Sequence, residues 1–542
     1  MITPFLDTTR CTISTLSPVH IGCGEDYYPT NYVIDDGLLH HFSEEGLLSA
    51  LTLAEKNALA NLAGEQSENG IKKIQEFIFS KKDRLQFQAT HSVPLSKALE
   101  DFYRSRIGQT AQHEAKGKKV NNKLEIARHA FNPYNQTPYF AGSSIKGAIR
   151  TALLNALNQG DPLPMRLDIN RDAPRGSGDQ LQKRVLGYQA ISDNLEKGIK
   201  GDPLRLLKVS DAIYSHADNL HASEIRFAVN RKNKPSKFEA KGLNQLLECM
   251  PANRSRGLTF DMTFLADQFS HYRWTLRDIC IACNEFFVPQ LEKELDLLQQ
   301  LNHCDSSWAK GVENLLANEL AEAFREHKAF LLRVGQHGGA ESNTLEGVRH
   351  IKIMQGQGNP SKYLDKPTTI WLAANHKDEQ HGLLPFGWVL VEIGDFKFDK
   401  THDFIKAQAQ KDYELQDKLQ GLVARRREFL ESENLKREKQ ALEEAQAIEA
   451  ERLKDEAQQA KLAKLADMTP EQQVIFELKD ALEKDKNPDP TGPLRQQLAG
   501  AIKQAENWTS EDKVALFEIG QTLCNLWGKP KKLKDQLKAL QS

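Results

Sequence analysis

The sequence lacks any long apolar run. No stretch approaches the roughly 18 consecutive apolar residues by which a membrane-spanning helix is recognised. The first ten residues, MITPFLDTTR, also lack the charged and then apolar layout of a secretory signal peptide. We therefore expect a cytoplasmic protein that does not act in a membrane.

Cysteine is scarce as well. Seven cysteines are scattered along the 542 residues, which is unlike a disulfide-stapled secreted domain and favours reduced thiols. Cys280 and Cys283 have the spacing of a pair of zinc ligands, and His303 and Cys304 follow them. Because Cys280, Cys283 and Phe287 would share one face of a helix, we favour buried core cysteines. We expect neither a metal nor a cofactor.

The chain also lacks a large excess of positive or negative charge, since its net charge is −2. The overall charge therefore does not indicate a nucleic-acid-binding protein. The basic residues are nevertheless unevenly distributed. Nine Lys and Arg stand against two acidic residues between Arg104 and Arg150, and eight stand against two between Ile225 and Phe260. Such segments can neutralise phosphates, although a run of charge alone is more often a solvated face.

Strand and helix patterns are interleaved in the first part of the chain. Asp35, Asp36 and Gly37 provide the turn of a hairpin. Apolar residues three and four apart predict helices over residues 46–99 and 276–332. The segments predicted to form further strands are residues 204–212, 224–232 and 258–266, TTIWLAA and WVLVEIG.

The composition changes abruptly near residue 399. Residues 401–467 have 15 acidic and 13 basic side chains, one glycine and no proline, which predicts a long solvated helix or a helical hairpin. Thr469 and Pro470 then form a helix-start signature. We therefore expect three parts, residues 1–395, 396–467 and 468–542, of which the last is a small helical domain.

One stretch, PYFAGSSIKGAIR at residues 138–150, looks at first like a nucleotide-binding loop. The Walker motif requires four residues between two glycines and then Lys-Ser/Thr, whereas the lysine here precedes the second glycine. The spacing therefore argues against nucleotide hydrolysis. The stretch fits a helix capped by Ser143 or Ser144, and equally a phosphate site at the helix N-terminus with Lys146 and Arg150 on one face.

Two further segments can carry chemistry. SPVHIGCGEDY, residues 17–27, places His20 beside glycines that let another chain approach closely. A structural histidine is the alternative, because acid-base catalysis would need a second proton-transfer group. Residues 333–358 include six glycines among basic residues, and they fit either a loop that wraps a phosphate backbone or an ordinary surface loop.

Taken in order, several segments resemble the RAMP (repeat-associated mysterious protein) superfamily of CRISPR effector subunits. These segments are STLSPVHIGCGEDY, PYFAGSSIKGAIRTALL, LKVSDA, RVGQHGGAESNT and LPFGWVLVEI. Within the superfamily they match best the branch of the fifth Csm subunit of type III-A complexes, which caps the crRNA 3′ end. The resemblance covers residues 10–395. Ala141 replaces a proline that is usual in the family, and residues 400–542 exceed the family's normal length.

The resemblance implies an α+β fold. Its core would consist of one or two ferredoxin-like units of the RNA-recognition type with glycine-rich loops and helical insertions, followed by a long helical C-terminal extension. It implies a non-catalytic subunit that binds the crRNA backbone near its 3′ end, caps the RAMP filament and contributes to crRNA maturation and antiviral defence. The implied partners are crRNA, neighbouring RAMP backbone and small subunits, and recruited nucleases.

The resemblance also indicates RNA-binding positions, to which we add Lys352 from the third segment. These positions are His20, Gly22, Gly24, Gly142, Ser143, Ser144, Lys146, Arg150, Arg333, Gly335, Gly338, Gly339 and Lys352.

Two alternatives stay open. Metal-independent nucleases of the same superfamily use a histidine base, so His20 would be the base of an endoribonuclease that processes precursor crRNA. The same motifs would also fit a subunit of the related Cmr complexes, which would bind RNA alike but have different neighbours.

Overall fold

The computed structural model describes most of the chain. The described residues are 4–64, 68–108, 111–113, 119–121, 124–161, 174–186, 202–215, 220–235, 244–266, 273–353, 360–394, 396–528 and 530–540. Contacts within the chain divide it into two units, Met1–Leu430 and Glu431–Ser542.

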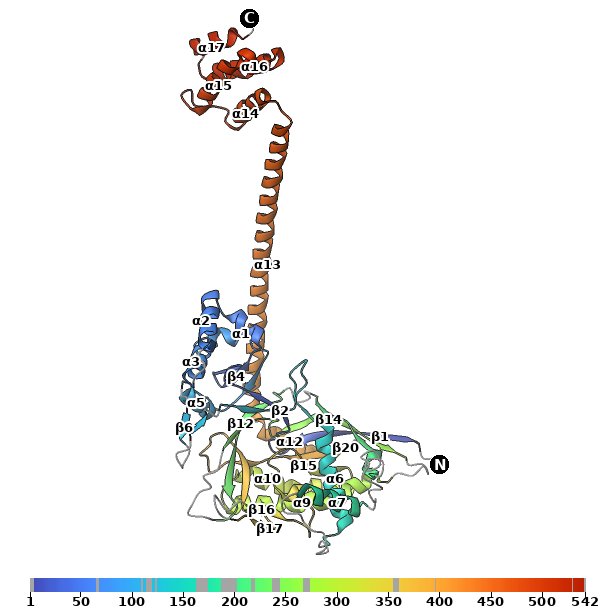
Figure 1. The fold of residues 1–542 in the computed structure, drawn as a ribbon. Coiled ribbons are helices and arrows are strands. Elements are labelled where there is room, and N and C mark those ends of the chain that lie inside the picture. The colour runs from blue at the N-terminus through green and yellow to red at the C-terminus, as the bar shows by residue number, and fades with distance from the viewer. Residues whose placement is uncertain are drawn as a thin grey trace. The chain divides into compact units, whose positions relative to one another are not determined.

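The first unit contains a seven-stranded antiparallel sheet in the order β15, β20, β1, β14, β11 and β9, with β10 also paired to β14 (Figure 1). The strands are β1 (Leu6–Thr15), β9 (Tyr139–Phe140), β10 (Leu207–Val209), β11 (Ala212–Tyr214), β14 (Arg254–Leu265), β15 (Ala329–Arg333) and β20 (Trp388–Ile393). Helices α6 (Gly142–Asn158) and α9 (Leu276–Gln300) pack against each other and against this sheet.

The order of these elements along the chain is that of a ferredoxin-like unit. Strand β1 leads to α6, then to β10 and β11, β14, α9 and finally β15 and β20, and β1 lies between β14 and β20 in the sheet. The alternation along β1 and β14 explains how the sheet packs, because Cys11, Ile13, Phe260 and Met262 are all buried. The predicted α+β class is confirmed.

A second, six-stranded sheet has the order β19, β18, β12, β13, β8 and β2, and β13 and β8 pair in parallel. Its strands are β2 (Gly22–Tyr27), β8 (Ile126–His129), β12 (Glu224–Lys232), β13 (Gln245–Cys249), β18 (Thr369–Ala374) and β19 (Leu384–Pro385). The remaining strands are β3 (Tyr32–Asp35), β4 (Leu38–His41), β5 (His91–Pro94), β6 (Ala111–His113), β7 (Lys119–Asn121), β16 (Ile351–Ile353) and β17 (Lys362–Leu364).

Further helices surround the sheets of the first unit. They are α1 (Glu44–Ala50), α2 (Leu53–Gly64), α3 (Glu68–Phe79), α4 (Lys82–Leu85), α5 (Lys97–Arg106), α7 (Pro174–Val185), α10 (Ser306–Ala317), α11 (Glu319–Arg325) and α12 (Asp399–Gln408), with short 3-10 turns η1 (Pro203–Leu206) and η2 (Glu341–Asn343). The predicted hairpin turn at Asp35–Gly37 joins β3 to β4. The prediction of helix throughout residues 46–99 is wrong at β5, because His91–Pro94 pairs with β4.

The first part of α13 (Gln410–Ala466) belongs to the first unit together with α12. Ile405 and Leu422 are buried, and the Phe429 ring stacks on Phe87 at 4.9 Å. The side chain of Arg254, 0% exposed, forms an ion pair of 2.8 Å with Asp412. A buried guanidinium requires such a partner, so this helix is part of the fold of the first unit.

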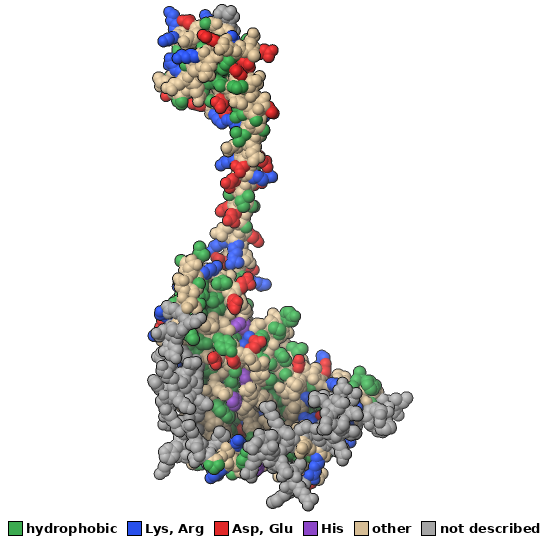
Figure 2. Space-filling model, viewed as in Figure 1, with side chains coloured by type: hydrophobic (Ala, Val, Ile, Leu, Met, Phe, Trp, Pro, Cys, Tyr) green, Lys and Arg blue, Asp and Glu red, His purple; other side chains and the backbone are tan. Residues whose placement is uncertain are grey.

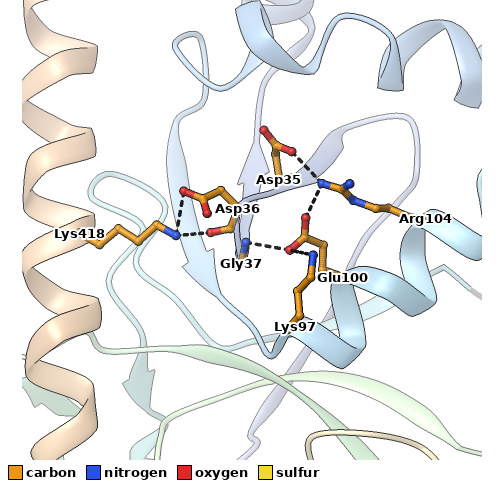
Figure 3. Close-up of a pocket in the computed structure, with 7 residues that line it drawn as sticks. All are labelled: Asp35, Asp36, Gly37, Lys97, Glu100, Arg104 and Lys418. Atoms are coloured by element: carbon orange, nitrogen blue, oxygen red, sulfur yellow. Dashed lines mark hydrogen bonds and ion pairs between the residues drawn. The ribbon is translucent and has the colours of Figure 1, made fainter.

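A pocket of about 530 Å³ is lined by Lys418 of α13, the β3–β4 turn and α5 (Figure 3). Its charged groups pair with one another: Lys418 with Asp36 at 2.8 Å, and Arg104 with both Asp35 and Glu100. The Lys418–Asp36 pair holds α13 against the β3–β4 turn. Because the charges around the pocket are paired with one another, we do not assign a ligand site to it.

The second unit begins within α13 and ends in a small helical domain. Residues 434–460 are exposed, and Figure 2 shows acidic and basic side chains mixed along this helix. The pairs Glu433–Lys436 and Glu449–Arg452 stabilise it locally. The domain consists of α14 (Pro470–Lys484), α15 (Pro493–Gln504), η3 (Ala505–Asn507), α16 (Ser510–Leu526) and α17 (Lys531–Lys538) around its own apolar core. The predicted cap by Thr469 is confirmed.

None of the helices in the described part of the chain combines the length and the apolar character that crossing a bilayer requires. The domain boundaries predicted at residues 395 and 467 stay predictions.

Asp412→Ala tests the role of α13 in the first unit. We expect the free energy of unfolding to fall by about 1.5–3 kcal/mol, because the buried Arg254 loses its charged partner. Lys418→Ala on the same helix is the control, and removing its exposed pair should cost less than about 1 kcal/mol. Urea unfolding of the full chain measures both values, and equal effects would contradict this role.

Candidate nucleic-acid interface

Three segments that are far apart in the sequence meet through their backbones near residue 20. The His20 carbonyl accepts a hydrogen bond from the Gln336 amide at 2.8 Å. The Gly387 amide donates to Pro18 at 2.9 Å, and the Gly387 carbonyl accepts from Val334 at 2.9 Å. The SPVHIG, RVGQHGG and LPFGW segments therefore form one structural cluster.

Glycine is required at two positions of this cluster. Gly335 has a φ of 84°, and a Cβ there would lie 2.3 Å from the His20 carbonyl oxygen. Gly387 has a φ of 93°, and a Cβ there would lie 2.5 Å from the Val334 carbonyl oxygen. Both the backbone conformation and the close approach exclude a side chain.

A second cluster surrounds the start of α6. The Gly142 amide donates to the Asp211 carboxylate at 2.7 Å, and a Cβ on Gly142 would lie 2.4 Å from the Val209 carbonyl oxygen. The predicted serine cap is wrong: α6 begins at Gly142 after Ala141, which forms no side-chain cap. Asp211 takes the place of that cap, and its negative charge is favourable at the positive end of the helix.

The predicted cations near α6 have partners within the protein. Lys146 donates to the Leu207 carbonyl at 2.8 Å. Arg150 forms an ion pair of 2.7 Å with Asp202. Because Asp211 also occupies the anion position at the helix end, the geometry gives no support to a phosphate clamp formed by Gly142, Lys146 and Arg150. Ser143 is exposed and Ser144 is half-buried, and RNA contact by these residues stays a prediction.

Arg333 is likewise a structural residue. It is 8% exposed and forms an ion pair of 2.8 Å with Glu294, and its Nε donates to the Phe386 carbonyl. The Trp388 indole donates to the same carboxylate at 2.6 Å. Arg333 therefore supports the glycine-rich loop from beneath. No local pattern in the sequence distinguishes Glu294, which lies within the apolar repeat of α9.

Two glycine-bearing segments lie side by side at the surface, and we call residues 22–24 and 335–339 together the glycine surface. A Cβ on Gly22 would lie 2.9 Å from the Gln336 side-chain nitrogen. Strand β2 leaves its register with β8 between Gly22 and Asp26, so the backbone of this bulge departs from the ladder. Gly24 has a φ of 84° and open space around it.

The loop of residues 335–339, which contains Gln336, has a backbone conformation that suits anion binding. Gly335, His337 and Gly339 have φ values of 84°, 65° and 76°. Left-handed residues alternating with ordinary ones are typical of an anion-binding nest, in which successive amides turn toward one side, and the Gln336 amide of this series donates to the His20 carbonyl. The His337 ring lies 4.6 Å from Trp371, which holds the one non-glycine left-handed residue of this series in place. The small Gly338 packs against the Arg333 side chain.

Neutral histidines lie beneath the glycine surface. His20 is buried and its Nδ1 lies 2.6 Å from the Glu248 carbonyl oxygen, to which it donates. Burial lowers the pKa of His20 below its ordinary value, and lowers the pKa of His129 to about 3 and that of His337 to about 4. His129 accepts from the Ile21 amide at 3.0 Å and donates to the Tyr139 carbonyl at 3.1 Å. It thereby links the two clusters.

Other surfaces of the first unit differ in character. Lys352 on β16 is exposed, and its neighbour His350 stacks on Tyr363 at 4.4 Å. The β1–β14 pair presents hydroxyls and the Arg10–Asp261 ion pair, which offer hydrogen bonds and charge instead of rings for base stacking.

The cysteines are buried as predicted at 280, 283 and 304. Within the described residues, no group of three or more His, Cys, Asp or Glu is placed to hold a metal ion.

Gly142→Ala tests whether the PYFAGSSIKG motif is structural. We expect a loss of about 1–3 kcal/mol in the free energy of unfolding, because the new Cβ meets backbone oxygens of Val209 and Ser210. Gly147→Ala in the same helix meets nothing within 4 Å and should stabilise the protein by about 0.5–1 kcal/mol. Chemical unfolding of both variants gives the comparison, and a neutral Gly142→Ala would refute the structural role.

Comparison with known proteins places the motifs in context. The family model of the RAMP superfamily matches residues 12–335. A curated relative, the CRISPR system Cms protein Csm5 of Methanocaldococcus jannaschii, is 30% identical over 200 residues, which cover 36% of this chain and 41% of that protein. The match thus spans less than half of that relative's length.

Two solved structures are also similar. A chain of the Csm–crRNA–target RNA ternary complex of a type III-A CRISPR-Cas system aligns with a TM-score of 0.45 and 19% identity over 71% of this chain and 100% of that chain. T. onnurineus Csm5 aligns with a TM-score of 0.39 and 18% identity over 70% and 99% of the two chains.

The family model covers more than half of the 542 residues and includes β1, α6, β14 and α9 of the ferredoxin-like unit. The chain belongs to the RAMP superfamily.

Proposed function

We propose that this chain is a non-catalytic RNA-binding subunit of a type III CRISPR effector complex, of the kind represented by the fifth Csm subunit. It binds the crRNA backbone near its 3′ end, caps the RAMP filament and contributes to crRNA maturation and antiviral defence in the cytoplasm. The observation that carries this proposal is the match to the RAMP family over residues 12–335, together with 30% identity to a Csm5 protein.

The glycine surface supports this proposal physically. Amides of a nest donate to phosphate oxygens, and the missing side chains at Gly22 and Gly24 let a sugar-phosphate chain approach the protein backbone. Such contacts hold RNA of any sequence because they do not read base edges. A guide-carrying subunit needs this tolerance, since guides differ in sequence.

The proposed partners are crRNA, neighbouring RAMP backbone and small subunits, and recruited nucleases. Residues 431–542 form a unit with its own core, and we propose that it docks another protein or a neighbouring subunit. A subunit of a Cmr-type complex would bind RNA in the same way as a Csm-type subunit but would have different neighbouring subunits.

One observation favours a second function. Because His20 is neutral and its Nε2 has no partner among the described residues, it has the lone pair that the base of a metal-independent ribonuclease needs. Purified protein incubated with repeat-containing RNA in EDTA separates the two functions, since only a nuclease cuts the RNA.

Purification of the tagged full chain from its native cells, followed by sequencing of the bound RNA, tests the proposal. We expect RNAs that contain repeat and spacer sequence with a common 3′ boundary, because the subunit is proposed to contact that end. RNA no different from that bound by an unrelated tagged protein would contradict the proposal.

Lys352→Ala tests the phosphate contact by an exposed cation. The slope of log affinity for crRNA against log salt concentration should become shallower by about 0.7, the value for one single-stranded phosphate. Lys503→Ala, an exposed lysine of the second unit, should leave the slope unchanged. Binding titrations at several salt concentrations measure both slopes, and equal slopes for the two variants would remove Lys352 from the interface.

A further inference from the structure

His20 is held in one tautomer. Its Nδ1 lies 2.6 Å from the Glu248 carbonyl oxygen, which can only accept a hydrogen bond, so Nδ1 carries the proton. The other nitrogen, Nε2, is therefore an acceptor. Burial favours the neutral ring, so Nε2 keeps its lone pair at neutral pH.

This acceptor is unsatisfied. The side chain is 0% exposed, and Nε2 has no hydrogen-bond partner within the described residues. Buried polar atoms are normally paired, because an unpaired one loses its hydrogen bonds to water without replacement. A ligand that brings a donor to Nε2 would recover this lost free energy.

Nε2 is directed toward the glycine surface. It lies 3.3 Å from the point where a Cβ on Gly22 would be, and the Gln336 side-chain nitrogen lies 2.9 Å from the same point. Gly22 and Gln336 are both exposed. The acceptor therefore lies next to two exposed residues, one a glycine without a Cβ and the other a flexible side chain.

The chemistry of a nucleic-acid backbone restricts what can pair with this atom. Phosphate and ring oxygens accept hydrogen bonds but cannot donate them. Apart from terminal hydroxyls, the ribose 2′-hydroxyl is the one donor along an RNA backbone, and it is missing from DNA. An acceptor beside a phosphate-binding nest thus matches ribose alone.

We propose that His20 Nε2 accepts a hydrogen bond from a ribose 2′-hydroxyl of the RNA bound at the glycine surface, and that it selects RNA over DNA there. This inference rests on the proposed RNA-binding function. Gln336 swings aside when RNA binds, and Gly22 leaves room for the ribose.

The test compares the binding of RNA with that of 2′-fluoro RNA of the same sequence by the full chain. The fluorine keeps the ribose pucker but removes the donor. The modified RNA carries one 2′-fluoro nucleotide at the site. We expect the wild-type protein to bind the unmodified RNA about five-fold more tightly than this modified RNA, the effect of one neutral hydrogen bond.

Two substitutions at His20 distinguish the donor role of Nδ1 from the acceptor role of Nε2. His20→Asn keeps an amide donor for the Glu248 carbonyl but has no acceptor at the Nε2 position, and it should bind both RNAs equally. His20→Gln places an amide oxygen near that position and should retain the preference. If His20→Asn retains the full preference, the proposal is overturned.

Gly22→Val provides an independent variant should His20→Asn not fold. A Cβ at this position lies 3.3 Å from Nε2, so the valine side chain closes the approach to the acceptor and should lower the preference to one. A full preference in this variant would also overturn the proposal. His20-dependent cleavage of the RNA in EDTA would replace the acceptor role by that of a base. Failure of the wild type to bind either RNA would instead refute the proposed function itself.

Discussion

Direct backbone-to-backbone contact at glycines is the constraint on which the first unit depends. At Gly335 and Gly387 a Cβ would lie within 2.5 Å of a carbonyl oxygen, and the same holds at Gly142. These contacts join segments that are separated by 53 to 315 residues into two clusters, and His129 bridges the clusters through Ile21 and Tyr139. The RAMP motifs therefore occur together because they pack on one another.

This constraint changes the interpretation of the motif cations. Lys146, Arg150 and Arg333 donate to groups of the protein itself, so their charge stabilises the clusters. What the clusters present to solvent is backbone: the bulge at residues 22–24 and the left-handed alternation at residues 335–339. Proposed RNA binding thus uses amides and one buried histidine more than exposed positive charge.

Local signals in the sequence were sufficient for several turns and caps but not for the partners of buried polar groups. The Asp35–Gly37 turn and the Thr469 cap were predicted because a few adjacent residues determine each. The carboxylates that pair with Gly142, Arg150 and Arg333 lie 69, 52 and 39 residues away, and only the fold brings them together. Strand β5 was missed because its state depends on pairing with β4.

Hydrogen–deuterium exchange of the full chain with and without crRNA tests most directly whether the glycine surface is the RNA-binding surface. We predict that RNA slows exchange in peptides containing residues 22–24 and 335–339, because phosphates and ribose cover these amides. The amides of residues 142–150 should exchange alike in both states, since the Gly142 amide already donates to Asp211 and the segment is the start of helix α6. Protection of residues 142–150 without protection of the glycine surface would contradict the account.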